Sequence, residues 1–197
     1  ARSPDLLKAT ALPHHKVNPM TIYTIGHSNH PWERFLELLK TAKIEVVMDV
    51  RSFPRSRWPQ FSGDALRDRL DVAGIGYRYF GTELGGRSDT TTVSYQEIAK
   101  SASFRESLEL VTNIAGGRRS ALMCSEHEPL ECHRCLLVGR YLADQGRKVA
   151  HILRDGAIED HRLTEQRLLR KFDRRLPAGT DREGSAYTLQ EQRIRQI

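Results

Sequence analysis

The sequence of 197 residues lacks the features that mark membrane or disulfide-rich proteins. No apolar run approaches the roughly 18 residues needed to span a bilayer, and we expect no signal peptide, since no basic region followed by an apolar core is seen in the first residues. Only three cysteines are present, and Cys124, Cys132 and Cys135 lie close together. A disulfide framework would distribute its pairs across the fold, so we expect a reduced, cytoplasmic protein with a local thiol site and no membrane partner.

A dominant charge of one sign is also lacking. The chain has 31 Lys and Arg against 25 Asp and Glu, and its formal net charge is +6. Residues 1–19 have no useful periodicity and precede Met20, which predicts a disordered leader or an expression remnant. They contain three basic residues and one acidic residue, so total charge is a weak argument for any partner.

Short apolar strands alternate with amphipathic helices along residues 20–160. Apolar or β-branched runs predict strands at 21–27, 44–50, 77–80, 120–123 and 148–153. Apolar residues at helical spacing predict helices at 31–41, 63–73, 95–100, 104–115 and 133–145. This order predicts one α/β domain with an open, mainly parallel sheet and helices on both faces, a rhodanese-like or Rossmann-like three-layer fold. Residues 161–197 are expected to form a basic helix and a flexible tail.

Polar side chains and glycines follow four of the predicted strands. His27 follows the first strand, Asp49 and Arg51 the second, Glu83 and Gly85-Gly86-Arg87 the third, and Cys124 ends the fourth. Because parallel sheets form their sites at the carboxyl ends of their strands, we expect these residues to converge on one rim. Plainer interpretations exist, since Asp49 and Arg51 could form a structural ion pair and the glycines could only permit a turn.

The stretch from Cys124 to Arg134 carries the most chemistry. It joins a strand to a helix, and such a loop offers backbone N–H groups to an anion and lowers the pKa of a cysteine. Its own acidic residues act in the opposite direction, and a buried strand-end cysteine can be inert. We predict catalytic roles for Cys124, Glu126, His27, Asp49 and His133, and substrate or anion binding for Arg51, Arg55, Ser56, Gly85, Gly86, Cys132 and Arg134.

A nucleic-acid function is one alternative. The Arg55–Trp58 loop and the basic helix could grip phosphates while the pocket acts on a modified or damaged base. The candidate residues are Arg57, Trp58, Arg167, Arg170 and Lys171.

A metal or thiol sensor is the second alternative. Cys124, His127, Cys132 and His133 are possible zinc ligands, although their spacing matches no structural zinc site and Arg134 disfavours a cation. No cofactor is firmly implied, a metal is possible, and the oligomeric state stays open.

Four motifs in order resemble a prokaryotic family known as domain of unknown function 488. They are Thr-Ile-Gly-His-Ser at 24–28, Asp-Val-Arg-x-x-Pro-x-Ser at 49–56, Leu-Gly-Gly at 84–86 and Cys-x-Glu-x-x-Pro-x-x-Cys-His-Arg at 124–134. A looser resemblance is to rhodanese-like sulfurtransferases, which would make Cys124 a thiolate nucleophile or persulfide carrier stabilised by Arg134. We therefore expect an enzyme, a thiol-dependent transferase or a hydrolase or lyase, with a small phosphate- or sulfur-containing anion as substrate.

Overall fold

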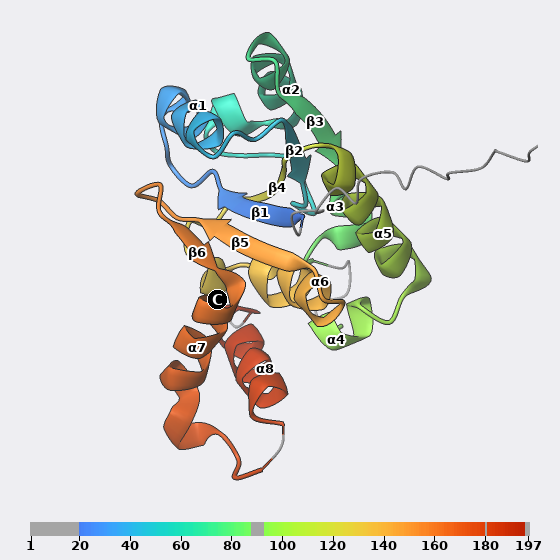
Figure 1. Cartoon of the computed structure of the whole chain (residues 1–197), viewed down its shortest axis with the longest axis vertical. Helices are drawn as coiled ribbons and strands as arrows, with labels where there is room; N and C mark the ends of the chain where they lie inside the picture. The colour runs from blue at the N-terminus through green and yellow to red at the C-terminus, as the bar shows by residue number, and fades with distance from the viewer. Residues whose placement is uncertain (1–19, 88–92, 180, 196–197) are drawn as a thin grey trace, which may run out of the picture.

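A six-stranded sheet forms the centre of the computed structural model, which describes residues 20–87, 93–179 and 181–195 (Figure 1). The strand order is β3-β2-β4-β1-β5-β6. All pairings are parallel except that of β6 with β5, so the predicted open and mainly parallel sheet is confirmed, with an antiparallel edge strand that was not predicted. The strands are β1 (Thr21–Gly26), β2 (Val46–Asp49), β3 (Gly76–Tyr79), β4 (Ser120–Cys124), β5 (Lys148–Ile152) and β6 (Ile158–Asp160).

Helices cover both faces of the sheet. Those on one face are α1 (Trp32–Thr41) and α2 (Gly63–Val72). Those on the other face or beside it are α3 (Gly81–Leu84), α4 (Tyr95–Ile98), α5 (Ala102–Gly117), α6 (Arg140–Asp144), α7 (His161–Phe172) and α8 (Arg182–Arg195). In the described parts of the chain, no helix combines the length and apolar character that crossing a membrane requires.

The strands supply side chains to two separate cores. Ala121 and Met123 of β4 pack in the core beneath α1 and α2, whereas Leu122 and Cys124 pack in the core beneath α5 and α6. Successive side chains of a strand point to opposite faces, so a strand that is covered on both faces needs a continuous apolar run. This explains why the β4 sequence does not alternate between apolar and polar residues.

Two segments near the predicted site differ from their predicted form. The segment after Phe80, for which no helix was predicted, contains helix α3. The helix expected over 133–145 follows a 3₁₀ turn, η2 (Pro129–Glu131), and begins as a π-helical segment, η3 (Arg134–Gly139), before it continues as α6. A π-helical turn is wider than an α-helical one, and such turns often occur at functional sites.

The C-terminal region is more ordered than the expected flexible tail. Helices α7 and α8 lie side by side (Figure 1), and Ala186, Tyr187 and Gln190 of α8 are buried. The Gln190 side-chain amide donates a hydrogen bond to the Leu130 carbonyl at 2.6 Å. Because Leu130 belongs to η2, this contact ties α8 to the Cys124–Arg134 loop. The predicted leader, residues 1–19, lies outside the described residues.

Candidate functional site

Three adjacent strands end at the predicted site. β4 lies between β2 and β1, with Gly26 beside Cys124 and Asp49 beside Met123. The strand ends therefore converge as expected from a parallel sheet. The side chains, however, leave the sheet on opposite faces and form two groups.

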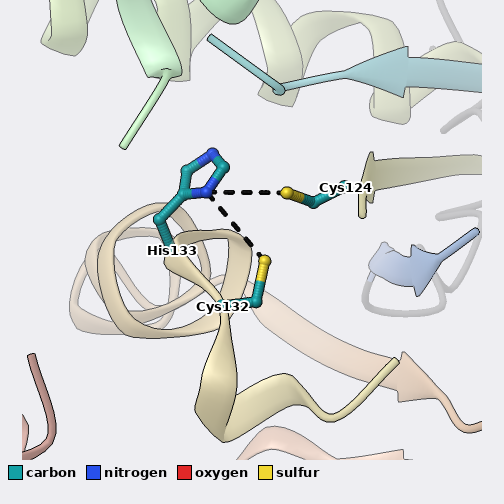
Figure 2. A group of neighbouring side chains, drawn as sticks. All are labelled: Cys124, Cys132 and His133. Atoms are coloured by element: carbon teal, nitrogen blue, oxygen red, sulfur yellow. Dashed lines mark hydrogen bonds between the residues drawn. The ribbon is translucent and has the colours of Figure 1, made fainter. Parts of the chain in front are cut away.

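The first group is the thiol–imidazole cluster, formed by Cys124, Cys132 and His133. Figure 2 shows His133 Nδ1 pointing toward both sulfur atoms, at 3.6 Å from Cys124 Sγ and 3.9 Å from Cys132 Sγ. On the other side of the ring, His133 Nε2 lies 2.7 Å from the Val50 carbonyl oxygen. A carbonyl can only accept, so Nε2 carries a proton, and Nδ1 is the ring nitrogen that faces the two sulfurs.

The surroundings shift the pKa values of the two thiols of the cluster in opposite directions. The hydrogen bond to Cys132, together with burial, holds the pKa of Cys124 well above its usual range. Burial also opposes ionisation of Cys132, but the hydrogen bond from Cys124 and the Arg134 charge outweigh it and hold the pKa of Cys132 well below its usual range. Of the two thiols, Cys132 is therefore the one whose ionisation the surroundings favour, whereas the sequence pointed to Cys124 as the thiolate.

Two glycines allow the backbone to close around the cluster. A Cβ on Gly86 would lie 2.6 Å from both Cβ and Cγ of His133, and a Cβ on Gly26 would lie 1.8 Å from the Glu126 carbonyl oxygen. The Gly86 turn can thus press against the imidazole only because it has no side chain. Gly86 therefore has a specific packing role beside the cluster.

A cavity of about 970 Å³ opens on the cluster. Seven predicted site residues line it, and these are Arg51, Arg55, Gly86, Cys124, Glu126, Cys132 and His133. The other lining residues are Ser52, Phe53, Arg87, Tyr95, Ser125, Glu131, Ile194 and Arg195.

The cavity wall contains cations that pair with no carboxylate in the part of the chain that the structure describes. Among the described residues, neither Arg55 nor Arg87 contacts an acidic side chain. Glu131, by contrast, pairs with Lys171 at 3.6 Å and with Arg193 at 3.4 Å. The wall therefore offers positive charge to a ligand, and of its two acidic residues, Glu126 and Glu131, Glu131 is already paired.

The second group is a buried ion pair on the α1 and α2 side of the sheet. Asp49 accepts from Arg51 Nε at 2.9 Å and from Arg51 Nη2 at 2.6 Å, and Tyr77 donates to the same carboxylate at 2.8 Å. Arg51 Nη1 donates to the Phe61 carbonyl at 2.8 Å. This network holds the loop after β2. Asp49 does not line the cavity, and the structural interpretation of the pair fits its surroundings.

His27 belongs to this second group. Its ring stacks on Phe61 at 4.4 Å, its Nδ1 donates to the Ser28 carbonyl, and its Nε2 faces Arg51 Nη1 at 3.2 Å. Burial, followed by the Arg51 charge, lowers the pKa of His27 to about 4. His27 is therefore a neutral packing residue that does not line the cavity.

Arg134 lies beneath the loop and not in the cavity. Its side chain is fully buried, donates to the carbonyls of Glu126 and His127, and donates to Thr24 Oγ1 at 3.3 Å. The predicted substrate contact is thus replaced by a positioning role. Ser56 and Gly85, which were also predicted to bind an anion, are not among the lining residues. The Trp58 backbone N–H donates to Ser56 Oγ within the loop, and Gly85 is buried.

Most of the predicted nucleic-acid residues have partners within the chain. Arg167 pairs with Glu128 at 2.9 Å and Glu159 at 2.8 Å, and Lys171 pairs with Glu131. Arg57 lies over the Trp58 ring at 5.5 Å, and Arg170 donates to the Gln166 carbonyl. Neighbouring carboxylates therefore compensate the charges of Arg167 and Lys171 on α7.

Sequence reasoning missed several wall residues. Arg87 was expected on the rim after the third strand but was given no role, and Phe53 lies within the Asp49–Ser56 motif, beside residues that were singled out. Phe53 is 61% exposed, which is unusual for a phenylalanine and is a signal only the structure gives. Arg195 reaches the wall from α8, and no local pattern could place it there.

The family profile described as domain of unknown function DUF488 matches residues 31–141 of this sequence. The chain belongs to this family. The matched region of this DUF488 protein runs from α1 into α6 and contains the thiol–imidazole cluster, whereas α7 and α8 follow it. No curated protein and no solved structure matches the chain. The likeness to rhodanese-like sulfurtransferases therefore stays a prediction.

Proposed function

We propose that this DUF488 protein is an enzyme whose active site is the arginine-lined cavity, and that its substrate carries a phosphate- or sulfur-containing anionic group. The observation that carries the proposal is the pair Arg55 and Arg87, which lack carboxylate partners among the described residues and share one cavity with the cluster. Guanidinium groups bind such anions through paired, charge-assisted hydrogen bonds.

The remaining wall residues support a reaction beside the bound anion. The two thiols and the imidazole form the reactive centre, and the thiols act either on the substrate directly or as ligands of a bound ion. Glu126 lines the same cavity and can exchange a proton with the substrate. A volume of about 970 Å³ is at the upper end of the range for small-molecule sites.

Anion binding tests the proposal. Calorimetric titration with phosphate, tungstate and thiosulfate should show binding that weakens about 10-fold or more in Arg55→Gln and in Arg87→Gln, because each change removes charge-assisted hydrogen bonds. Arg105→Gln is the matched control, since Arg105 is exposed on α5 away from the cavity. Equal affinities in all three variants would refute the assignment of the wall.

Turnover tests the reactive centre. The wild-type protein is first screened with phosphoesters and sulfur-transfer substrates. The Cys132→Ser variant should then turn over each active substrate at least about 100-fold more slowly than the wild type. Cys135→Ser is the matched control, because Cys135 is buried in the core and does not line the cavity. Equal rates in the two variants would separate the reaction from the cluster.

A nucleic-acid substrate is a second candidate, and Phe53 is the observation that favours it. An exposed aromatic ring beside Arg51 and Arg55 matches a surface on which a base stacks while cations contact its phosphates. Anisotropy measurements with single-stranded DNA and RNA should show binding that weakens with salt and falls about 10-fold in Phe53→Ala. Arg170→Gln on α7 should leave it unchanged, and the opposite pattern would make α7 the interface.

A further inference from the structure

We propose that Cys124, Cys132 and His133 hold a thiophilic divalent metal ion, of which zinc is the type case, with one coordination position open to the cavity. The inference shares the cavity of the proposed function and rests on it only for the use of that open position. Two thiolates and one imidazole are a ligand set that zinc accepts, and three protein ligands leave a fourth position for water or substrate.

The distances within the cluster suit a tetrahedral ion. Bonds of about 2.3 Å to sulfur and about 2.1 Å to nitrogen, at an angle near 109°, separate the two ligand atoms by about 3.6 Å. The measured Nδ1–Sγ separations are 3.6 Å and 3.9 Å, and all three ligand atoms lie within 4.8 Å of one another. An ion at the centre of these atoms would require little movement of the side chains.

The surroundings orient the ligands as a metal site requires. His133 Nε2 donates to the Val50 carbonyl, which is the outer hydrogen bond that metal-binding histidines commonly make and which directs the Nδ1 lone pair at the sulfurs. The Arg134 backbone N–H lies 3.5 Å from Cys132 Sγ and can donate to it. Hydrogen bonds to backbone groups thus orient both His133 and Cys132.

The positive charge of Arg134 is compatible with a metal. Its guanidinium donates to the carbonyls of Glu126 and His127, and two thiolates cancel the charge of a divalent ion. All three ligand residues line the cavity, so the open position faces the arginine-rich wall. There the ion could polarise an oxygen of an anionic substrate or of water.

A nearby cluster provides an internal comparison. Cys135, His151 and His161 also lie within 4.8 Å of one another. Yet His151 Nε2 and His161 Nδ1 are only 2.9 Å apart, the length of a hydrogen bond, whereas two nitrogen ligands of a tetrahedral zinc lie about 3.4 Å apart. Their remaining nitrogens bond to Thr24 and Tyr187. This second cluster is a hydrogen-bonded chain, and Cys135 is the matched control cysteine.

Metal titration of the full chain tests the inference. The reduced protein, first stripped with a chelator, is titrated with Co²⁺ while its visible spectrum is recorded, and the Co²⁺ is then displaced with Zn²⁺. We expect one equivalent of Co²⁺ to give the intense bands of a tetrahedral thiolate site and one equivalent of Zn²⁺ to remove them. Cys132→Ser and His133→Gln should each weaken binding about 100-fold or more, whereas Cys135→Ala should retain the wild-type stoichiometry.

The outcomes separate this inference from the proposed function. Absence of the tetrahedral spectrum, or the same spectrum in Cys124→Ser/Cys132→Ser, would overturn the metal site, and far-ultraviolet circular dichroism establishes that each variant is folded. Anion binding that depends on Arg55 in a protein without metal would keep the proposed function and favour direct thiol chemistry. One tightly bound metal without anion binding would keep the metal site and refute the substrate class.

Discussion

At the residue scale, the Arg134 side chain donates hydrogen bonds to the irregular loop that follows β4. Its guanidinium satisfies the carbonyls of Glu126 and His127, and the side chain is fully buried. We predict that Arg134→Met lowers the free energy of unfolding by about 3 kcal/mol or more, because buried carbonyl groups lose their donors. Urea denaturation measures this. Arg105→Met on the exposed face of α5 should change stability by less than about 0.5 kcal/mol, and equal effects would contradict the positioning role.

The buried histidine pair makes stability depend on pH. Burial lowers the pKa of His161 from 6.5 to about 4, so between these values the unfolded chain binds the additional proton. Stability should therefore rise with pH from about 4 to about 6.5, by roughly 3 kcal/mol in total, and be lost on acidification. The groups that face or influence His161 are His151, Tyr187, Glu165, Asp144, Asp160 and Cys135.

The variant His161→Gln isolates this contribution. The free energy of unfolding is measured at several pH values. Between pH 4 and 6.5 its slope against pH should be smaller in the variant than in the wild type, by up to about 1.4 kcal/mol per pH unit. The absolute stability of the variant is not the readout, since the loss of two hydrogen bonds lowers it at every pH. A slope identical to that of the wild type would contradict the neutral, buried state of His161.

At the scale of elements, the Gly86 turn and η3 meet only in the folded protein. We predict that Gly86→Ala displaces His133, because the new Cβ would stand 2.6 Å from the imidazole side chain. Metal affinity and turnover should each fall about 10-fold or more, as expected for a small misplacement at a reactive centre. Gly117→Ala at the end of α5 is the control, since no atom lies within 4 Å of its added Cβ. Unchanged metal affinity in Gly86→Ala would contradict the close packing.

Helix α8 is tied to the loop by one buried amide. Gln190 is fully buried and donates to the Leu130 carbonyl of η2. We predict that Gln190→Ala destabilises the protein by about 1–3 kcal/mol, because the carbonyl loses its partner and a cavity remains. Gln192→Ala, on the exposed side of the same helix, should be neutral in the same urea denaturation experiment. Equal stabilities of the two variants would mean that α8 is not anchored through η2.

At the scale of the whole molecule, the sequence predicted what depends on local patterns. Continuous apolar runs located β2 and β4, and the parallel order followed from their alternation with helices. Residues at the ends of these strands, such as Cys124, were correctly expected near one another. The separation into two groups was not predictable, because the face on which Asp49 or Cys124 leaves the sheet depends on register and on the helices packed there.

The remaining misses have the same physical origin. Arg134 is a charged side chain, which is rarely buried completely, so its sequence position beside Cys132 and His133 suggested the cavity. Its inward direction depends on carbonyls that only the folded loop presents. The C-terminal sequence is polar and predicted a flexible tail. In the structure, however, α8 packs its few apolar side chains and contacts η2 through Gln190. Tertiary packing thus decided both cases.

The most direct test of the central claim is a crystal structure of the reduced protein grown with Zn²⁺ and tungstate, with anomalous data at both absorption edges. We predict a zinc ion bonded to Cys124 Sγ, Cys132 Sγ and His133 Nδ1, and a tungstate ion within hydrogen-bond distance of Arg55 or Arg87 in the same cavity. Zinc absent from this cluster, with tungstate bound only outside the cavity, would contradict both the reactive centre and its substrate class.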